Sequence, residues 1–144
     1  MYLVRRTARG RLAGKIVETE AYRGEDDLAC HASRGRTSRS EVLYALPGTL
    51  YVYLIYGMYW CLNIVTERRN FPSAVLIRAL EPTEGLPLMA RRRKAHDLKN
   101  LTSGPGKLCE ALGITGALHG KTLGIKTLVI ENRQTRIPPA TVCR

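Results

Sequence analysis

The stretch Pro47–Val65, PGTLYVYLIYGMYWCLNIV, decides how the rest of the chain is interpreted. It holds five of the nine aromatic residues and no Lys, Arg, Asp or Glu, although the chain carries a formal net charge of +11. Its β-branched and aromatic content predicts two strands, Thr49–Ile55 and Met58–Val65. Tyr56 and Gly57 fit the tip between them, because glycine accepts a positive φ. The sequence therefore predicts an aromatic β-hairpin.

Alternation along the first strand separates two faces. One face carries Tyr51, Tyr53 and Ile55, and the other carries Leu50, Val52 and Leu54. We expect the aliphatic face to pack on the core while the other face presents rings. The alternative is that the tyrosines are ordinary core aromatics, in which case each buried hydroxyl needs a hydrogen-bond partner.

Composition indicates one basic domain. The chain has 144 residues, with 23 Lys and Arg against 12 Asp and Glu. A pI near 10.0 predicts attraction to polyanions, although a basic protein without a specific partner is the simpler alternative. We find no signal peptide, and the apolar run Leu50–Val65 is too short and aromatic to span a bilayer. We therefore expect an intracellular protein with no membrane contact.

Four cysteines stand far apart in the sequence, at Cys30, Cys61, Cys109 and Cys143. They form no CxxC pair, which argues against a zinc site. In a basic chain without a signal peptide we expect them to be reduced. We expect no metal and no cofactor.

Two further segments place unusual charges on predicted strands. Ile16–Tyr22 alternates so that Glu18, Glu20 and Tyr22 share one face, unless this is simply a solvated edge strand. Arg78 interrupts the apolar strand Ser73–Leu80, and an Arg in that position usually has a carboxylate or phosphate partner.

Candidate phosphate contacts lie in two other segments. The loop Arg23–Ser40 carries Arg36, Thr37 and Arg39, which suit phosphate through guanidinium groups, hydroxyls and free amides. The alternative is a mobile surface loop. Lys107 follows Gly104-Pro105-Gly106 at the start of a predicted helix, where Lys107 and free amides could bind one phosphate.

The remaining elements are predicted from local signals. Arg5–Gly14 is interpreted as a hairpin turn, and Thr83–Lys94 as a helix capped by Thr83. A short helix within Leu101–Ile114 is expected to stop at Gly113. Leu123–Glu131 is the last predicted strand, and an irregular tail follows it.

The chemistry available to these parts is limited. The candidates are a carboxylate, Glu20, an arginine embedded in a strand, Arg78, one loop histidine, His31, and many rings. A positioned carboxylate can act as a general base on water, and rings can enclose an extruded base. The set suits hydrolysis of an N-glycosidic bond.

Four blocks of sequence together resemble one family. The blocks are VETEAYRGEDDLACH, PGTLYVYLIYGMYWCLNIV, VLIRALEP and SGPGKLCEALGI, and they run from about Lys15 to Ile114. They are similar to the alkyladenine (3-methyladenine) DNA glycosylase family of the aromatic-hairpin type. The resemblance implies an α+β fold with a single mixed domain, a curved antiparallel sheet with helices, and a protruding aromatic hairpin.

The resemblance also implies roles for individual residues. Glu20 matches the catalytic base that activates water, and Arg78 matches the arginine that helps to hold this water. Tyr56 matches the ring wedged into the duplex. Tyr22, His31, Tyr53 and Asn63 match residues of the pocket that holds the flipped base. In this family pattern His31 donates a hydrogen bond to the base, and Asn63 disfavours the exocyclic amine of normal guanine.

The implied activity is removal of alkylated or deaminated purines from double-stranded DNA by a monomer without metal or redox cofactor. Its location would be the cytoplasm (nucleoid) in a bacterium or the nucleus in a eukaryote. Compared with the family pattern, the chain 1–144 looks shortened at both ends. Two alternatives therefore stay open: a catalytically impaired relative that only binds lesion DNA, and a basic RNA-binding protein with an aromatic sheet.

Overall fold

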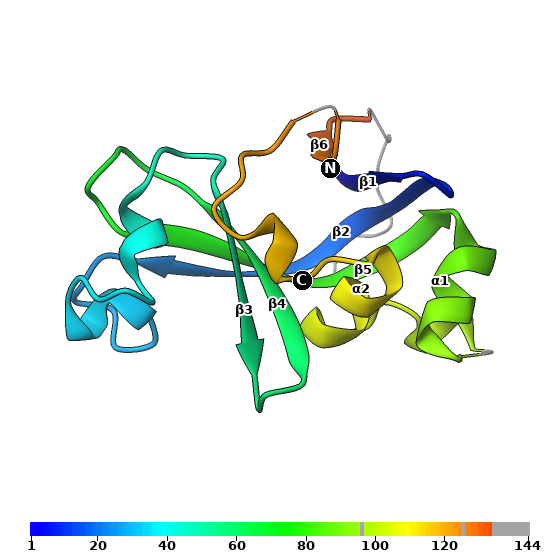
Figure 1. Cartoon of the computed structure of the whole chain (residues 1–144), viewed down its shortest axis with the longest axis horizontal. Helices are drawn as coiled ribbons and strands as arrows, with labels where there is room; N and C mark the ends of the chain where they lie inside the picture. Colours follow the sequence, from blue (N-terminus) through cyan, green and yellow to red (C-terminus); the bar gives the residue numbers. More distant parts are fainter. Residues whose placement is uncertain (96, 125, 134–144) are drawn as a thin grey trace, which may run out of the picture.

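The chain folds around one curved, fully antiparallel sheet of six strands in the order β3-β4-β5-β2-β1-β6 (Figure 1). The computed structural model describes residues 1–95, 97–124 and 126–133. The strands are β1 Tyr2–Thr7, β2 Gly10–Arg23, β3 Leu50–Ile55, β4 Tyr59–Val65, β5 Ser73–Glu84 and β6 Leu128–Glu131. Two α-helices, α1 Leu86–Arg93 and α2 Pro105–Leu112, complete the main elements. The predicted α+β class is confirmed.

The strands β2 and β5 are longer than the sequence signals predicted. The predicted hairpin turn within Arg5–Gly14 is present but much shorter than that range, because only Ala8 and Arg9 separate the antiparallel strands β1 and β2. The hydroxyl of Thr7 accepts a bond from the amide of Arg9 at 3.2 Å and closes this short turn. Leu3 on β1 and Leu12 on β2 are fully buried. The free energy gained by burying these side chains stabilises the paired strands although the segment is basic.

A helix is present within Thr83–Lys94, but the prediction that Thr83 caps it was wrong. β5 continues to Glu84, with Pro82 opposite Gly14 on β2. A Cβ at Gly14 would lie 2.9 Å from the Cβ of Leu80, so only glycine permits this close pairing. The helix α1 starts instead after Gly85, whose φ of +76° favours glycine.

The core lies between the sheet and the two helices. Side chains that face this core include Leu50, Val52, Leu62, Ile64 and Ile77 from the strands, and Leu108 and Leu112 from α2. The predicted stop of α2 at Gly113 is confirmed, with Gly113 in the left-handed conformation at φ +64°. The predicted strand Leu123–Glu131 is present only in its second half, as β6.

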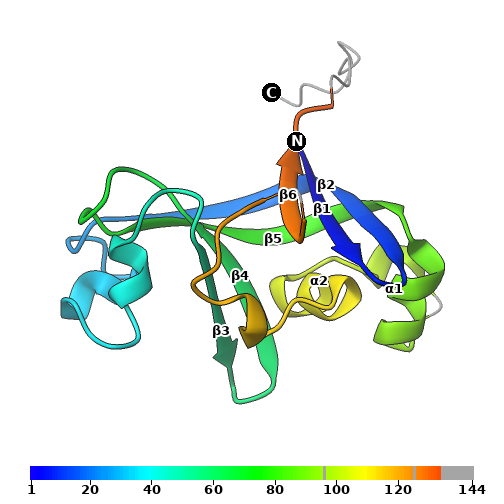
Figure 2. The same cartoon turned by 45° about the horizontal axis from the view of Figure 1, so that its top comes forward.

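The opposite face of β3 and β4 is covered by residues 24–49. This segment contains two short 3₁₀ helices, η1 His31–Arg34 and η2 Glu41–Tyr44. Figures 1 and 2 show the β3–β4 hairpin descending between this segment on one side and α2 on the other. A second, smaller buried cluster forms here and contains Cys30, Ala32, Leu43, Tyr44, Tyr51, Val65 and Ala74. Leu50 and Val52 therefore pack on the main core as predicted, whereas Tyr51, at 2% exposure, is a core aromatic of the second cluster, as the alternative predicted.

The described residues contain no helix long and apolar enough to cross a membrane. Cys30, Cys61 and Cys109 are buried free thiols, as expected, while Cys143 and the predicted tail beyond Arg133 lie outside the described residues.

Candidate functional site

One row of residues crosses four strands on the tyrosine face of the sheet. Glu20 on β2 is opposite Leu76 on β5, Leu76 is opposite Asn63 on β4, and Asn63 is opposite Tyr51 on β3. Directly opposite residues in antiparallel strands point to the same face. The sheet therefore aligns residues that are far apart in sequence along one line.

At the β2 end of this row, Glu20 takes part in a set of charged hydrogen bonds. Arg78 Nη1 donates to Glu20 Oε2 at 2.7 Å, and Arg78 Nε donates to Glu18 Oε1 at 2.8 Å. The Tyr22 hydroxyl donates to the other oxygen, Glu20 Oε1, at 2.7 Å. The side chains of Glu20 and Arg78 are 41% and 39% exposed, so water reaches them. The predicted pairing of Arg78 with a carboxylate is confirmed.

The electrostatics of this cluster keep its groups in defined states. The bond to Glu18 and the charge of Glu20 raise the pKa of Arg78 further above its ordinary value. Burial, and then the hydrogen bond to Glu20, raise the pKa of Tyr22. Arg78 is therefore a permanent cation and Tyr22 a neutral donor at neutral pH.

Next to Tyr22 lies a small aromatic pocket of about 70 Å³. It is lined by Tyr22, Ala29, His31, Leu43, Tyr51, Tyr53 and Asn63. The structure thus brings together all four residues predicted for the base pocket. A cavity of roughly 150 Å³ holds benzene, so a purine needs the walls of this pocket to move apart.

The rings of the pocket contact one another, His31 with Tyr53 edge to face and Tyr51 with Tyr53 at a tilt of 32°. The His31 and Tyr53 centroids are 4.8 Å apart at 69°, and Tyr51 and Tyr53 are 4.9 Å apart. His31 Nδ1 lies 2.7 Å from the Tyr51 hydroxyl, so this buried hydroxyl has a partner. Burial, assisted by the charge of Arg39, lowers the pKa of His31. Burial raises the pKa of Tyr53 to about 12. The rings are therefore uncharged at neutral pH.

Asn63 is almost fully buried, with 2% exposure, at the back of this pocket. Its Nδ2 donates a long bond of 3.5 Å to the Tyr51 carbonyl. A buried amide has further hydrogen-bonding capacity that a polar ligand could use.

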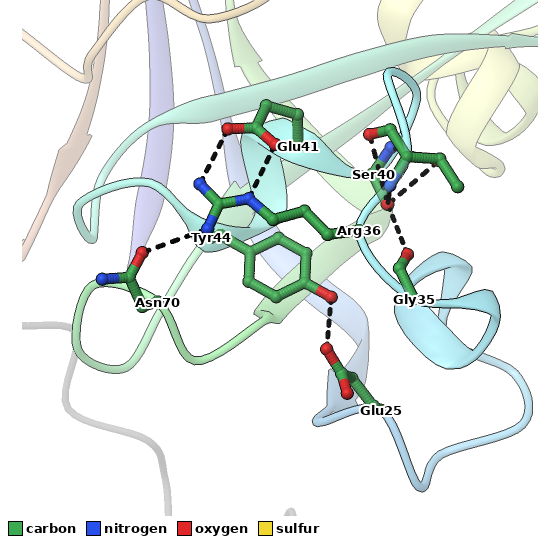
Figure 3. Close-up of polar contacts among 8 residues, drawn as sticks. Glu25, Gly35, Arg36, Ser40, Glu41, Tyr44 and Asn70 are labelled. Atoms are coloured by element: carbon green, nitrogen blue, oxygen red, sulfur yellow. Dashed lines mark hydrogen bonds and ion pairs between the residues drawn. The ribbon is translucent and has the colours of Figure 1, made fainter.

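A polar cluster fixes the covering loop, and we call Glu25, Arg36, Glu41, Tyr44 and Asn70 the loop cluster (Figure 3). Arg36 donates through Nε and Nη2 to the two Glu41 oxygens at 2.7 Å each, and through Nη1 to Asn70 at 3.4 Å. Its guanidinium lies 4.9 Å from the centroid of the Tyr44 ring. The Tyr44 hydroxyl donates to Glu25 at 2.6 Å. The loop cluster therefore ties the loop that carries His31 and Leu43 to the turn before β5.

The predicted phosphate contacts lie in different surroundings. Arg36 belongs to the loop cluster, and the Thr37 amide and hydroxyl bond to the Ser40 hydroxyl at 2.8 and 3.1 Å. Arg39 is exposed and lies 5.5 Å from the centroid of Tyr53, at the edge of the aromatic pocket. Lys107 donates to Ser103 at 3.3 Å and shares a surface pocket with Ile55 and Tyr59 of the hairpin.

Tyr56 occupies the tip of the hairpin, apart from the aromatic pocket. Its side chain is 88% exposed, and its backbone has a φ of +52°. A left-handed conformation costs a non-glycine residue roughly 1–2 kcal/mol. Strain of this kind often marks a position retained for function.

Sequence reasoning missed several residues of the site. Tyr51 and Leu43 line the pocket, and Leu76 fills the row between Glu20 and Asn63 with 4% exposure. Alternation already placed Tyr51 on the same face as Tyr53, so that signal was present. Nothing in the spacing identified Glu18 as the second partner of Arg78. Among the described residues, no group of three or more His, Cys, Asp or Glu forms a metal site.

The fold and the site define an α+β protein with a carboxylate–guanidinium pair beside an aromatic pocket. The sequence model of the methylpurine-DNA glycosylase family matches residues 1–144. The chain belongs to this family, as its resemblance predicted.

Two relatives, each named "Putative 3-methyladenine DNA glycosylase", illustrate the similarity. The relative from Methanocella arvoryzae is 59% identical over 119 residues, which cover 82% of this chain and 60% of the relative. The relative from Myxococcus xanthus is 50% identical over 135 residues, which cover 93% of this chain and 63% of the relative. The chain therefore spans about three fifths of the length of these relatives.

Proposed function

We propose that this chain acts on double-stranded DNA as a monofunctional glycosylase that removes alkylated or deaminated purines. The observation that carries the proposal is the position of Glu20, bonded to Arg78 and Tyr22 beside an aromatic pocket. Family membership supports the same reaction class. The product is an abasic site and a free base.

In the proposed reaction, Glu20 accepts a proton from a water molecule, and Arg78 helps to hold this water. The water oxygen forms a bond to the sugar C1′, the N-glycosidic bond breaks, and its electron pair leaves with the base. Carboxylates near the sugar stabilise the positive charge that develops on it. A base that already carries an alkyl group and a positive charge leaves as a neutral molecule, so it needs no proton donor. A neutral lesion such as hypoxanthine leaves as an anion and takes up a proton from water to give the free base.

Recognition follows from the aromatic pocket. Tyr22, His31 and Tyr53 enclose the extruded base, and electron-rich rings favour a cationic alkylated base. With the Tyr51 hydroxyl donating to Nδ1, neutral His31 holds its proton on Nε2 and can donate it to the base. Asn63 acts at the back of the pocket against the amine of normal guanine.

The hairpin tip and the cations act on the duplex. Tyr56 fills the gap left by the extruded nucleotide, which its exposure and strained backbone support. Arg39, Thr37 and Lys107 contact phosphates. Arg36 is a further proposed phosphate contact, for which a phosphate competes with Glu41, because both oxygens of that carboxylate accept from Arg36. We further propose that the protein acts as a monomer inside the cell.

The test is base release from a duplex that carries one hypoxanthine or ethenoadenine, followed by cleavage in alkali. We expect cleavage at the lesion by the wild-type chain and a loss of roughly 10²–10⁴-fold in Glu20→Gln. Glu81→Gln is the matched control, because Glu81 is an exposed carboxylate on the same strand as Arg78. Equal cleavage by Glu20→Gln would remove Glu20 from the mechanism.

A second function, lesion binding without turnover, is favoured by the small volume of the pocket, which has to open before a purine can enter. It predicts Tyr56-dependent binding to lesion duplex without base release. The cleavage assay and a gel-shift assay on the same duplex separate the two functions.

A further inference from the structure

We infer that Glu18 is a positioning residue that fixes the guanidinium of Arg78 in the orientation that engages Glu20. The inference rests on the proposed function and deepens it, because it gives a role to the second carboxylate of the cluster. Glu18 accepts from Nε of Arg78, while Glu20 accepts from Nη1. Two bonds from different nitrogens define the plane of a guanidinium, whereas one bond leaves it free to rotate.

The pairing of β2 with β5 is irregular at the point where Glu18 and Arg78 meet. Ile16 is opposite Leu80 and Glu18 is opposite Ala79, which leaves Val17 as an extra residue on β2. Thr19 is then opposite Ile77, which leaves Arg78 as an extra residue on β5. The two bulges compensate each other, so the pairing beyond them continues in the original register.

Bulges bend a strand and redirect side chains, and they are common next to active sites. Here the extra residue on β5 is Arg78 itself, and the residue between the two irregularities is Glu18. In a regular ladder of the same register Arg78 alone would stand opposite Glu18, so the register of the sheet already brings these two residues together. The bulge instead gives Glu18 two neighbours on β5, Arg78 and Ala79. The backbone therefore places Arg78 within reach of both carboxylates.

The simpler explanation is a surface ion pair with no further role. Glu18 is 57% exposed, and exposed pairs contribute little to stability. This explanation predicts that removing Glu18 changes neither the orientation of Arg78 nor the rate of base release. Positioning predicts that both change, while the affinity for the lesion duplex stays the same.

The experiment compares Glu18→Ala and Glu18→Gln with the wild-type chain, and uses Glu81→Ala as the control. Proton–nitrogen NMR of arginine Nε–H groups reports the bond from Arg78, whose signal is assigned by its absence in Arg78→Lys. Single-turnover base release and lesion-duplex affinity are measured on the same variants. Circular dichroism verifies that each variant is folded.

In Glu18→Ala we expect the Arg78 Nε–H signal to shift and to exchange faster with water. We expect base release to slow roughly 10- to 100-fold, because small misplacements of a positioning group cost this much, while affinity stays within about twofold. Glu18→Gln should retain most of the Arg78 Nε–H signal and most of the rate of base release, because the glutamine side-chain oxygen still accepts from Nε. Glu81→Ala should match the wild type.

An unchanged Arg78 signal in Glu18→Ala overturns the inference, and so does an unchanged rate when the signal has shifted. If the wild-type chain releases no base, the proposed function fails and the catalytic part of the inference fails with it. The Arg78 signal then still decides whether Glu18 holds the guanidinium, so the two failures are distinguishable.

Discussion

Replacing Tyr44 by Phe tests the loop cluster with a single atom. Tyr44 is 5% exposed, and its hydroxyl donates to Glu25 at 2.6 Å. The variant removes this bond and leaves the ring, so it creates no cavity. Hydrogen bonds to charged groups contribute about 1.5–3 kcal/mol, and the exposure of Glu25 reduces this to about 1–2 kcal/mol. For a chain of 144 residues, this loss lowers the melting temperature by about 3–7 °C.

The same variant predicts a pH dependence. Burial, and then the bond to Glu25, raise the pKa of Tyr44 to about 12, from an ordinary value of 10.0. Because the folded-state pKa is raised, the stabilisation is complete below pH 10 and is lost as the pH rises towards 12. The difference in free energy of unfolding between the wild type and Tyr44→Phe should therefore shrink over this range.

Urea unfolding followed by circular dichroism measures both effects. Tyr59→Phe is the control, because Tyr59 is 48% exposed and should change stability by less than about 0.5 kcal/mol. Combining Tyr44→Phe with Glu25→Gln should give less than the sum of the single effects. An additive double variant, or a melting temperature equal to that of the wild type, would refute the reasoning.

Three other outcomes are expected. Tyr56→Gly should weaken binding to lesion duplex in a gel shift. The same variant should leave the stability of the protein unchanged or raise it by up to about 1 kcal/mol in a thermal melt, because glycine relieves the strain of a φ of +52°, and a clear loss of stability would contradict this. Gly85→Ala should lower the free energy of unfolding in urea by more than about 2 kcal/mol, because its Cβ would meet Leu12 Cδ2 at 2.3 Å. The control Gly35→Ala has open space around its Cβ and only backbone strain, so equal losses of stability in the two variants would remove the steric argument. Arg39→Ala should reduce the slope of log affinity against log salt by about 1, and an unchanged slope would exclude a phosphate contact.

The sequence predicted the parts of the fold that depend on local pattern. Alternation separated Tyr51 and Tyr53 from Leu50 and Val52, and the two faces of the hairpin are packed accordingly. Gly113 ended its helix because the left-handed position there favours glycine. The pairing of Arg78 with a carboxylate followed from the cost of leaving a charge in an apolar strand.

The missed features depend on contacts between distant segments. The predicted strand ended at Leu80, but β5 continues beside Gly14, a residue far away in sequence whose missing side chain leaves room for Leu80 and Glu81. The paired bulges leave no periodic signal, so Glu18 could not be assigned to Arg78 from spacing. Glu41 and Asn70 likewise meet Arg36 only after the loop has folded over the sheet. The roles of individual site residues remain predictions.

The pairing of β1 with β6 has a consequence for synthesis. Tyr2 is opposite Glu131 and Arg5 is opposite Leu128, so β1 waits for a partner strand that is synthesised long after it. Until residue 131 leaves the ribosome, the outer edge of β1 has no partner and can pair with other nascent chains. Because this closure joins distant segments, we expect it to be a slow step in folding.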